Sequence, residues 1–418
     1  MALFSREIKS KLLQQPVAAR CGTCGRKSQN NSQSSKKCIN PLQPSGNGKS
    51  KILIVMGSPT SMNNASGSWF GDTDVLLREA FNNIDFDLRN DCWLTGAVAC
   101  YGASNIDVAA TSCLYNLHKT VKELNPVVII PLGIVAVQSV LSGAFSGLEV
   151  GDAVRYYGCQ IPSKRWNAWI CPTYDYDSVV EYGGGDISAM RGSGVVAALW
   201  FNKHIENIKR VIDKRPFGTC EIEPQNQVKL LYAKNEISEI LQYIGNFDKG
   251  YAAFDYETNC LKPEVSNSRV LSASVCLGGY KKVFETVAFP MTPDIIPVWR
   301  TFLQSGIPKI AHNLKFEDRW SNVWFGVSVN NWYADTFLNS HILDCRRGVC
   351  GLKFQTLVNF GVSGYDDPVK PYISSVDKLN KLHEIPIEQL LLYNGLDSLF
   401  TWRLAIKQFK QLGIKAYW

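Results

Sequence analysis

The stretch "YAAFDYET", residues 251–258, decides how the second half of the chain folds. Its small and aromatic residues suit a buried β-strand, and Asp255 and Glu257 stand near the end of that strand. The two carboxylates are two residues apart, so they lie on the same face of the strand. Two acids on one face of a strand end are costly unless a cation neutralises them. The stretch therefore predicts a sheet with a metal site at the end of one strand.

The residues around this strand extend the prediction to a whole domain. Further strands are expected over residues 228–233, 269–278 and 281–290, the last two forming a meander with the first stretch. A helix is expected over residues 235–245, with Asn235 as its N-cap. Mostly helical sequence runs from Val298 to the end. The second half is thus predicted to combine a sheet with several helices.

The first half of the chain alternates apolar strands with helices. Strands are expected over residues 51–57, 92–100, 126–133 and 168–174. Helices are expected over residues 73–84, 112–124 and 194–213, and another follows the third strand. This alternation predicts a layered α/β domain with a mainly parallel sheet. The pattern breaks at "KRPFGTCEIEPQ", so we predict domains at residues 1–213 and 227–418, joined by a linker at residues 214–226.

Composition and charge exclude several classes of protein. A length of 418 residues suits two domains, and 45% hydrophobic with 19% charged residues excludes a disordered chain. The net charge of +7 is compatible with a nucleic-acid partner. Neither a secretory signal nor an unbroken membrane-spanning run is visible. Thirteen Cys without an export signal favour reduced thiols or a metal centre, so we expect a cytoplasmic protein with no membrane partner.

Two more fragments carry polar residues that suit the predicted metal site. "IAHNLKFED" contains Asn313, Glu317 and Asp318. "LLYNGLDSLF" contains Tyr393 and Asp397, which are four residues apart and therefore face one way on a helix. Each fragment is a weak signal alone. Their occurrence in this order, after the first acidic pair, is much more specific.

Together the three fragments resemble the motifs of the proofreading 3′–5′ exonucleases of the ribonuclease H-like fold, in the subgroup with a Tyr in the last motif. The likeness covers about residues 228–418 and implies a ribonuclease H-like domain with a mixed sheet. It also implies two Mg²⁺ or Mn²⁺ ions, which in that family clamp the scissile phosphate and activate the attacking water.

The resemblance assigns a role to four residues of the first and last motifs. Asp255 would bridge both ions. Glu257 and Asp397 would hold the ion nearest the water, and Tyr393 would orient that water.

The second motif departs from the family pattern, which has Asp four residues after Asn. That slot is Glu317 here, with Asp318 next to it. One residue is about 100° on a helix, so the two acids cannot both point inward. The register favours Glu317 as the metal ligand, and Asp318 is the alternative. Asn313, the first residue of the motif, is expected to contact DNA.

Cysteines of the first half form a second candidate site. Cys21 and Cys24 make a C-x-x-C pair, whereas Cys100 and Cys113 are thirteen residues apart. Zinc modules usually bring two tight pairs, and this wide spacing departs from them. Four thiolates gathered from distant points of an α/β domain suit a 4Fe–4S cluster instead. Cys38 is the reserve ligand.

The stretches "CGTCGRK", "CWLTGAVACYGASN" and "NPVVIIPLGIVAVQSVL" resemble the iron–sulfur uracil-DNA glycosylases (family 4). The likeness covers about residues 21–209 and implies a three-layer α/β/α domain in which Cys21, Cys24, Cys100 and Cys113 bind the cluster. It is greatest for the glycosylase-like domain fused ahead of the exonuclease in some bacteriophage DNA polymerases of family A.

The glycosylase motifs are altered at three positions that serve catalysis in that family. The family's acid corresponds to Gly57, its base-reading Asn to Gly96, and its His-Pro pair to Asp175-Tyr176. A carboxylate at position 175 would repel the negative charge that develops on the leaving base. Only Phe70 is left to stack on DNA. The domain is therefore expected to lack glycosylase activity.

The combined expectation is a DNA replication protein with metal-dependent 3′–5′ exonuclease (proofreading) activity on DNA. It would act at a single-stranded 3′ end or primer terminus. The sequence stops where the family's polymerase domain would begin, so a DNA polymerase is expected as a subunit in trans or as a missing C-terminal domain. The alternatives are an active uracil-DNA glycosylase with an accessory nuclease, and a non-enzymatic DNA-binding subunit of a polymerase.

Overall fold

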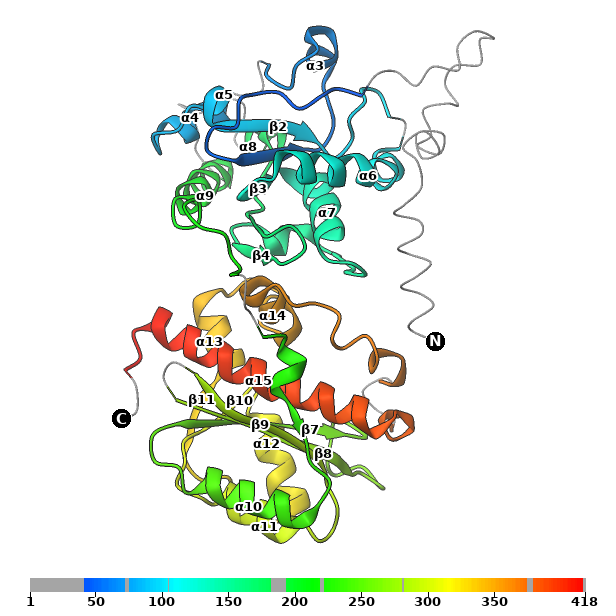
Figure 1. Ribbon diagram of the computed structural model, residues 1–418, viewed down its shortest axis with the longest axis vertical. Coiled ribbons are helices and arrows are strands. Elements are labelled where there is room, and N and C mark those ends of the chain that lie inside the picture. Colours follow the sequence, from blue (N-terminus) through cyan, green and yellow to red (C-terminus); the bar gives the residue numbers. More distant parts are fainter. Residues whose placement is uncertain are drawn as a thin grey trace. The chain divides into compact units, whose positions relative to one another are not determined.

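A computed structural model describes residues 41–71, 75–103, 105–181, 193–218, 222–279, 282–373 and 379–415. The chain forms two compact units (Figure 1). The first comprises the described residues up to 219 together with 358–361, and the second comprises 220–357 and the described residues from 362 on. Cys21, Cys24 and Cys38 lie outside the described residues. None of the described helices is both long enough and apolar enough to cross a membrane.

The first unit is built on a five-stranded sheet with the order β2-β1-β3-β5-β4. Its strands are β1 (Ile52–Met56), β2 (Cys92–Gly96), β3 (Val128–Pro131), β4 (Ile161–Ser163) and β5 (Ala168–Ile170). All neighbouring strands run parallel except β4, an antiparallel edge strand that pairs with β5. The prediction of a mainly parallel sheet is therefore confirmed.

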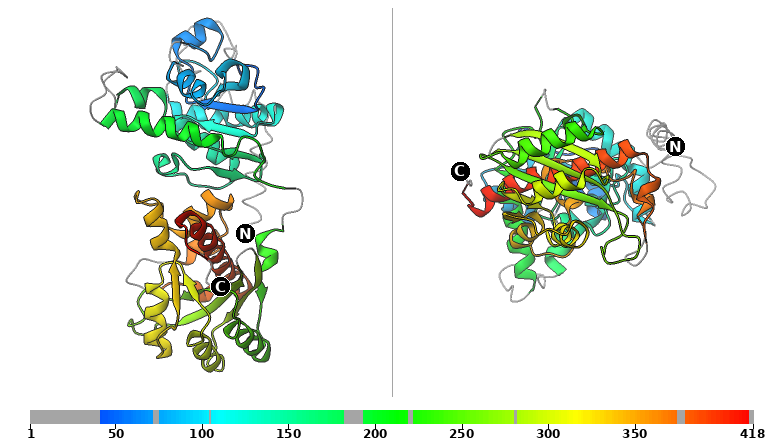
Figure 2. Two further views of the ribbon diagram at one scale, coloured as in Figure 1. Left: turned by 90° about the vertical axis from the view of Figure 1, so that its left-hand side faces the viewer. Right: turned by 90° about the horizontal axis from the view of Figure 1, so that it is seen from below.

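Helices cover both faces of this sheet (Figures 1 and 2). Ile52 and Ile54 of β1 pack with one group of helices, namely α4 (Val75–Asn82), α8 (Tyr176–Glu181) and α9 (Ser193–Ile208). The opposite face packs against α7 (Gly133–Ala144), which in turn contacts α6 (Ile106–Leu124). The three-layer α/β/α architecture is confirmed. Shorter elements are α3 (Ser61–Ser66), α5 (Leu88–Asp91) and η3 (Ala153–Tyr156).

The second unit is built on a six-stranded mixed sheet with the order β11-β10-β7-β8-β9-β6. Its strands are β6 (Lys229–Leu230), β7 (Tyr251–Thr258), β8 (Val270–Gly278), β9 (Val283–Pro290), β10 (Lys309–Ala311) and β11 (Trp332–Asp335). The pairs β7–β8 and β8–β9 are antiparallel, and the other pairs are parallel. The predicted meander and mixed sheet are confirmed.

The two faces of this sheet have different partners (Figure 1). Phe254 and Tyr256 of β7 pack in an apolar core with α10 (Lys234–Gly245) and α11 (Ile296–Leu303). The long helix α15 (Ile387–Leu412) crosses β7, β8 and β9. Because side chains alternate along a strand, Asp255 and Glu257 face away from the apolar core.

The remaining elements of the second unit are short. They are η5 (Pro224–Gln227), α12 (Lys315–Trp320), η6 (Ser321–Phe325), α13 (Thr336–Leu343), α14 (Leu352–Phe360), η7 (Lys370–Tyr372) and η8 (Leu382–Glu384). The prediction of Asn235 as a helix N-cap is wrong, because α10 begins at Lys234 and Ala233 holds the cap position. Ala233 has no side-chain oxygen to offer, so this helix begins without a side-chain cap.

Candidate functional sites

Three carboxylates of the second unit meet where β7 passes under α15. Asp255, Glu257 and Asp397 each place a carboxylate oxygen within 4.8 Å of those of the other two. The exposed fractions of Glu257 and Asp397 are only 8% and 6%. Residues 140 positions apart in the sequence thus form one acidic cluster. Oxygen ligands at this density suit hard cations such as Mg²⁺ or Mn²⁺.

A buried amide fixes the orientation of Asp255. The Nδ2 group of Asn394 donates a hydrogen bond of 2.7 Å to Asp255 Oδ2. Asn394 is itself held by β8, because Ser272 Oγ donates to its Oδ1 (3.0 Å) and Ser274 Oγ donates to its backbone oxygen (2.8 Å). Asn394 was not among the predicted site residues, although a polar residue inside the "LLYNGLDSLF" helix was a usable signal.

The second motif presents its two acids to different surroundings. Glu317 on α12 is 2% exposed, and its Oε2 has no hydrogen-bond partner in the described part of the chain. Burial raises the pKa of Glu317, and the charge of Asp255 raises it further. Asp318 instead accepts hydrogen bonds from Trp332 Nε1 and Asn322 Nδ2, both at 3.1 Å. A buried, unpartnered oxygen beside other acids suits a metal ligand, which favours Glu317.

The electrostatics of the cluster also suit a cation. Burial raises the pKa of Asp255 well above its ordinary value, and the charge of Asp397 adds to this effect. The pKa of Glu257 is raised by burial and by the charges of Asp255 and Asp397. The nearby Lys353 opposes both shifts. A divalent ion would relieve the repulsion among the acids, which is the second cause of these shifts after burial.

A lysine and a second tyrosine adjoin the cluster, and neither was among the predicted site residues. Lys353 Nζ, from the first turn of α14, forms an ion pair with Asp397 Oδ1. The Tyr365 hydroxyl donates to the same oxygen at 2.7 Å. Burial raises the pKa of Tyr365 and of Tyr393, and the charge of Asp397 raises both further. Both phenols therefore stay protonated at neutral pH.

Asp335 organises the loop that leads into the second motif. Its carboxylate accepts from the backbone N–H groups of Asn313 (2.9 Å) and Leu314 (3.1 Å). It also caps α13 by accepting from Phe337 (2.8 Å) and Leu338 (3.4 Å). Asn313 has a φ of 69°, and its side chain is exposed. Asp335 therefore fixes the start of the second motif without belonging to the acidic cluster of Asp255, Glu257 and Asp397.

Replacing Asp335 by Ala is expected to lower the free energy of unfolding by about 2–4 kcal/mol, because buried N–H groups would lose their acceptor. Thermal or urea unfolding would measure the loss. Asp344→Ala is a suitable control, because Asp344 mainly pairs with its neighbour Arg346 and is expected to cost less than about 1 kcal/mol. Equal losses for the two variants would contradict the capping role.

The raised carboxyl pKa values predict a pH-dependent stability of the metal-free protein. Each such carboxyl group makes its full contribution to stability below the pKa that it has in the unfolded chain, about 4. This contribution is lost as the pH rises through the higher pKa that the group has in the folded protein. The metal-free second unit should therefore unfold at a lower temperature at pH 8 than at pH 6. Mn²⁺ should reduce this difference, and so should the double variant Asp255→Asn/Glu257→Gln. Thermal unfolding in EDTA and in Mn²⁺ is the measurement, and a difference that neither change reduces would contradict the prediction.

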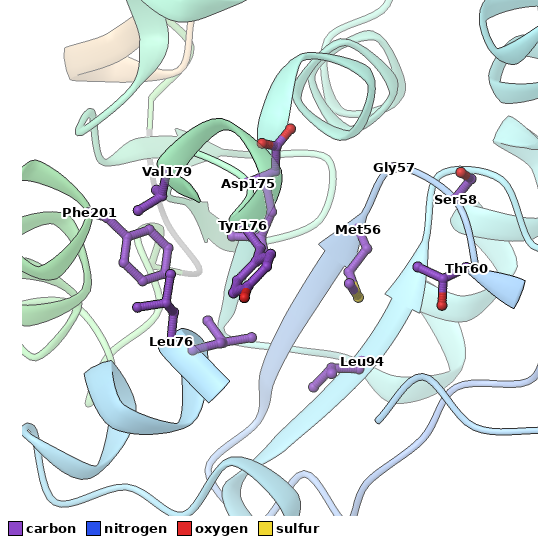
Figure 3. Close-up of a pocket in the computed structure, with 12 residues that line it drawn as sticks. Met56, Gly57, Ser58, Thr60, Leu76, Leu94, Asp175, Tyr176, Val179 and Phe201 are labelled. Atoms are coloured by element: carbon purple, nitrogen blue, oxygen red, sulfur yellow. The ribbon is translucent and has the colours of Figure 1, made fainter. Parts of the chain in front are cut away.

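Two of the three altered glycosylase positions border a pocket of the first unit (Figure 3). Gly57 and Asp175 both line it, together with Tyr176, whose ring points away from the Asp175 carboxylate. Asp175 Oδ1 accepts from the backbone N–H of Ser178 at 2.7 Å and so caps α8. The lining is otherwise mostly apolar.

The third altered position, Gly96, is covered by a tryptophan. A Cβ atom at Gly96 would lie 2.2 Å from the Trp69 ring and 2.8 Å from the backbone oxygen of Val98. Trp69 is only 1% exposed. The indole therefore fills the space that a base-reading side chain would need. Phe70 does not line the pocket, and its ring lies beneath the Arg89 guanidinium at 5.0 Å.

Two of the four predicted cluster cysteines lie in the described part of the chain. Cys113 is buried on α6 among Val98, Ala109 and Ala110, and Cys100 is partly exposed. The iron–sulfur site therefore stays a prediction, because Cys21, Cys24 and the reserve Cys38 are outside the described residues.

Comparison with known families assigns both units. Residues 43–180 match the Uracil DNA glycosylase superfamily, and residues 228–412 match the 3′-5′ exonuclease family. The chain therefore carries a uracil-DNA glycosylase superfamily domain followed by a 3′–5′ exonuclease domain, which confirms both predicted resemblances.

One curated protein is similar to part of this chain. The DNA polymerase of Escherichia phage T5 is 24% identical over 217 residues, which are 49% of this chain and 25% of the polymerase. The chain thus spans about a quarter of that relative's length.

Several solved structures are similar to part of this chain. The catalytic core of RRP6 from Trypanosoma brucei is 15% identical, with a TM-score of 0.34, over 47% of this chain and 48% of that chain. Escherichia coli RNase D is 12% identical, with a TM-score of 0.34, over 44% of this chain and 45% of that chain. Brucella melitensis NrnC is 20% identical, with a TM-score of 0.29, over 40% of this chain and 78% of that chain.

Proposed function

We propose that this chain is a metal-dependent 3′–5′ exodeoxyribonuclease that removes nucleotides from the 3′ end of a primer during DNA replication. The observation that carries the proposal is the acidic cluster of Asp255, Glu257 and Asp397 within 4.8 Å, inside a 3′–5′ exonuclease domain. The unpartnered Glu317 oxygen would supply a fourth ligand. Such a site would take two Mg²⁺ or Mn²⁺ ions, which stabilise charge on the phosphate and activate water.

The chain's own residues would prepare the site for this chemistry. Asn394 holds Asp255 in one orientation, so the bridging ligand needs little reorganisation. The protonated phenol of Tyr393 can hold the attacking water by a hydrogen bond. Asn313 lies exposed at the start of the second motif, where it can contact the DNA strand.

The test is an incubation of a 5′-labelled single strand with the purified protein and Mg²⁺ or Mn²⁺. We expect stepwise shortening from the 3′ end, and none in EDTA. A strand blocked by a terminal 3′ phosphorothioate should be shortened more slowly. A matched RNA strand and a primer with a mismatched 3′ end, run alongside, define the preferred substrate. DNA that stays at full length under all these conditions would overturn the proposal.

We also propose that the first domain does not excise uracil. Three altered positions and the Trp69 ring at Gly96 support this view, because removing several members of a cooperating site abolishes most of its activity. The test is a uracil-containing duplex incubated in EDTA, which would stop the nuclease. Abasic sites above the level of a no-enzyme control would contradict it.

Three further assignments belong to this proposal. Residues 214–226 would link a domain at 1–213 to one at 227–418. Cys21, Cys24, Cys100 and Cys113 would hold a 4Fe–4S cluster, which absorbance near about 400 nm and iron analysis would test. A DNA polymerase, in trans or in the same polypeptide, would be the partner in the cytoplasm, and co-purification with such a polymerase would support that.

A further inference from the structure

The ammonium group of Lys353 occupies a built cation site beside the acidic cluster. It pairs with Asp397 Oδ1 and donates to the Tyr365 hydroxyl oxygen at 3.0 Å. It also lies 4.2 Å from the centre of the Tyr365 ring and 4.3 Å from that of Tyr393. Two aromatic faces and a carboxylate around one ammonium group are a favourable environment for a cation. Nothing in the exonuclease motifs of the sequence points to this lysine.

Lys353 pairs with a carboxylate, Asp397, that a divalent ion would also need as a ligand. The side chain of Asp397 is only 9% exposed, so few groups can reach its oxygens. Lys353 and Tyr365 already share Oδ1. A metal ion bound by Asp397 would compete with the ammonium group for this carboxylate. The ammonium group and a metal ion bound beside it would also repel each other strongly, because the site is poorly solvated.

We propose that Lys353 is a positioning residue that acts as the resident cation of the acidic cluster until divalent ions bind, and that these ions displace it from Asp397. The proposal rests on the proposed nuclease function of the cluster. In the metal-free protein Lys353 and Tyr365 hold Asp397 in place, and Lys353 offsets part of the repulsion among the three acids. The cost of this arrangement is weaker metal binding in the absence of DNA.

This arrangement links metal binding to the arrival of the substrate. A released ammonium group beside the site is attracted to a phosphate of the DNA strand. The DNA would therefore favour the displaced position of Lys353, and the metal ions would favour it as well. Two ligands that favour the same state bind cooperatively, so DNA should increase the affinity of the cluster for metal.

The test measures Mn²⁺ binding to the full chain without DNA, by isothermal titration calorimetry at pH 8. Lys353→Met removes the charge and keeps a long side chain, and it should bind Mn²⁺ about tenfold more tightly than the unaltered protein. Lys353→Arg keeps the charge and should restore the weaker affinity. Lys234→Met on α10, on the other side of the sheet, removes an equal charge and should change nothing.

A second measurement guards against a variant that simply fails to fold. Without metal, Lys353→Met should unfold at a lower temperature than the unaltered protein, and Mn²⁺ should raise its unfolding temperature by a larger step. Equal or weaker Mn²⁺ binding by Lys353→Met would overturn the inference while leaving the nuclease proposal standing. If the unaltered protein also leaves a labelled single strand at full length in Mn²⁺, the proposed nuclease function fails, and the inference fails with it.

Discussion

Replacing Asp255 by Asn should slow the removal of 3′ nucleotides by about 10⁴-fold, which corresponds to about 5.5 kcal/mol of lost transition-state stabilisation. Asp255 is the acid that would contact both metal ions, so an amide in its place weakens the binding of both. An amide oxygen is neutral and cannot balance two divalent charges. Quenched time courses on a labelled single strand, at saturating Mg²⁺, would measure the rate.

The same substitution should stabilise the metal-free protein. The Asp255 carboxylate is buried among like charges, and its pKa is raised for that reason. Asn at this position removes the charge and can still accept the hydrogen bond from Asn394 through its Oδ1. We expect a gain of about 1–3 kcal/mol in the free energy of unfolding in EDTA. A substitution that lowers the activity and raises the stability is typical of a residue whose side chain serves function and not folding.

Asp318→Asn is the matched control for this prediction. Asp318 lies one residue beyond the metal-ligand slot and already makes hydrogen bonds to Trp332 and Asn322. Its substitution should change the rate by less than about threefold, because no metal ion would lose a ligand. If Asp318→Asn were as inactive as Asp255→Asn, the alternative assignment of the second motif would be favoured. If Asp255→Asn kept more than a tenth of the activity, the cluster would not be the catalytic centre.

Much of the fold followed from local patterns in the sequence. The strands β1, β2, β3 and β7 are apolar runs with clear ends, and alternation with helices is a strong sign of a parallel sheet. The edge strand β4 was missed because three residues, one of them a proline, carry little pattern. The start of α10 was misplaced because tertiary packing, and not a capping side chain, decides where that helix begins.

The acidic cluster was predictable because its members belong to short motifs with fixed spacing. Lys353 and Tyr365 were not predictable, because each acts through a contact with a residue far away in the sequence. Lys353 and Asp397 are 44 positions apart, and no periodicity in either segment couples them. The same holds for Trp69 and Gly96: the sequence shows that an amide is missing, and only the fold shows what fills its place.

Gly96, which the ring of Trp69 covers in the first domain, is the site of the second substitution with a large expected effect. Gly96→Ala should lower the free energy of unfolding of the first domain by about 3–5 kcal/mol, because the added methyl group would lie 2.2 Å from the ring of Trp69. The ring is fully buried and the other close atom is a backbone oxygen, so neither neighbour can easily move aside. Denaturant unfolding followed by circular dichroism and tryptophan fluorescence would measure the loss.

Gly57→Ala is the matched control, since it adds the same methyl group at another altered position of the glycosylase motifs. The nearest atom to a Cβ there is the Cβ of Val135 at 3.8 Å, which is an ordinary contact. This variant should differ from the unaltered protein by less than about 1 kcal/mol, and the smaller freedom of the unfolded chain should favour it. Equal stability of the two variants would mean that Trp69 does not occupy the space beside Gly96. A large loss of stability for Gly96→Ala, with little change for Gly57→Ala, would show that the family's side chain fits at position 96 only after the indole is removed. Packing against Trp69 would then be what maintains the altered motif.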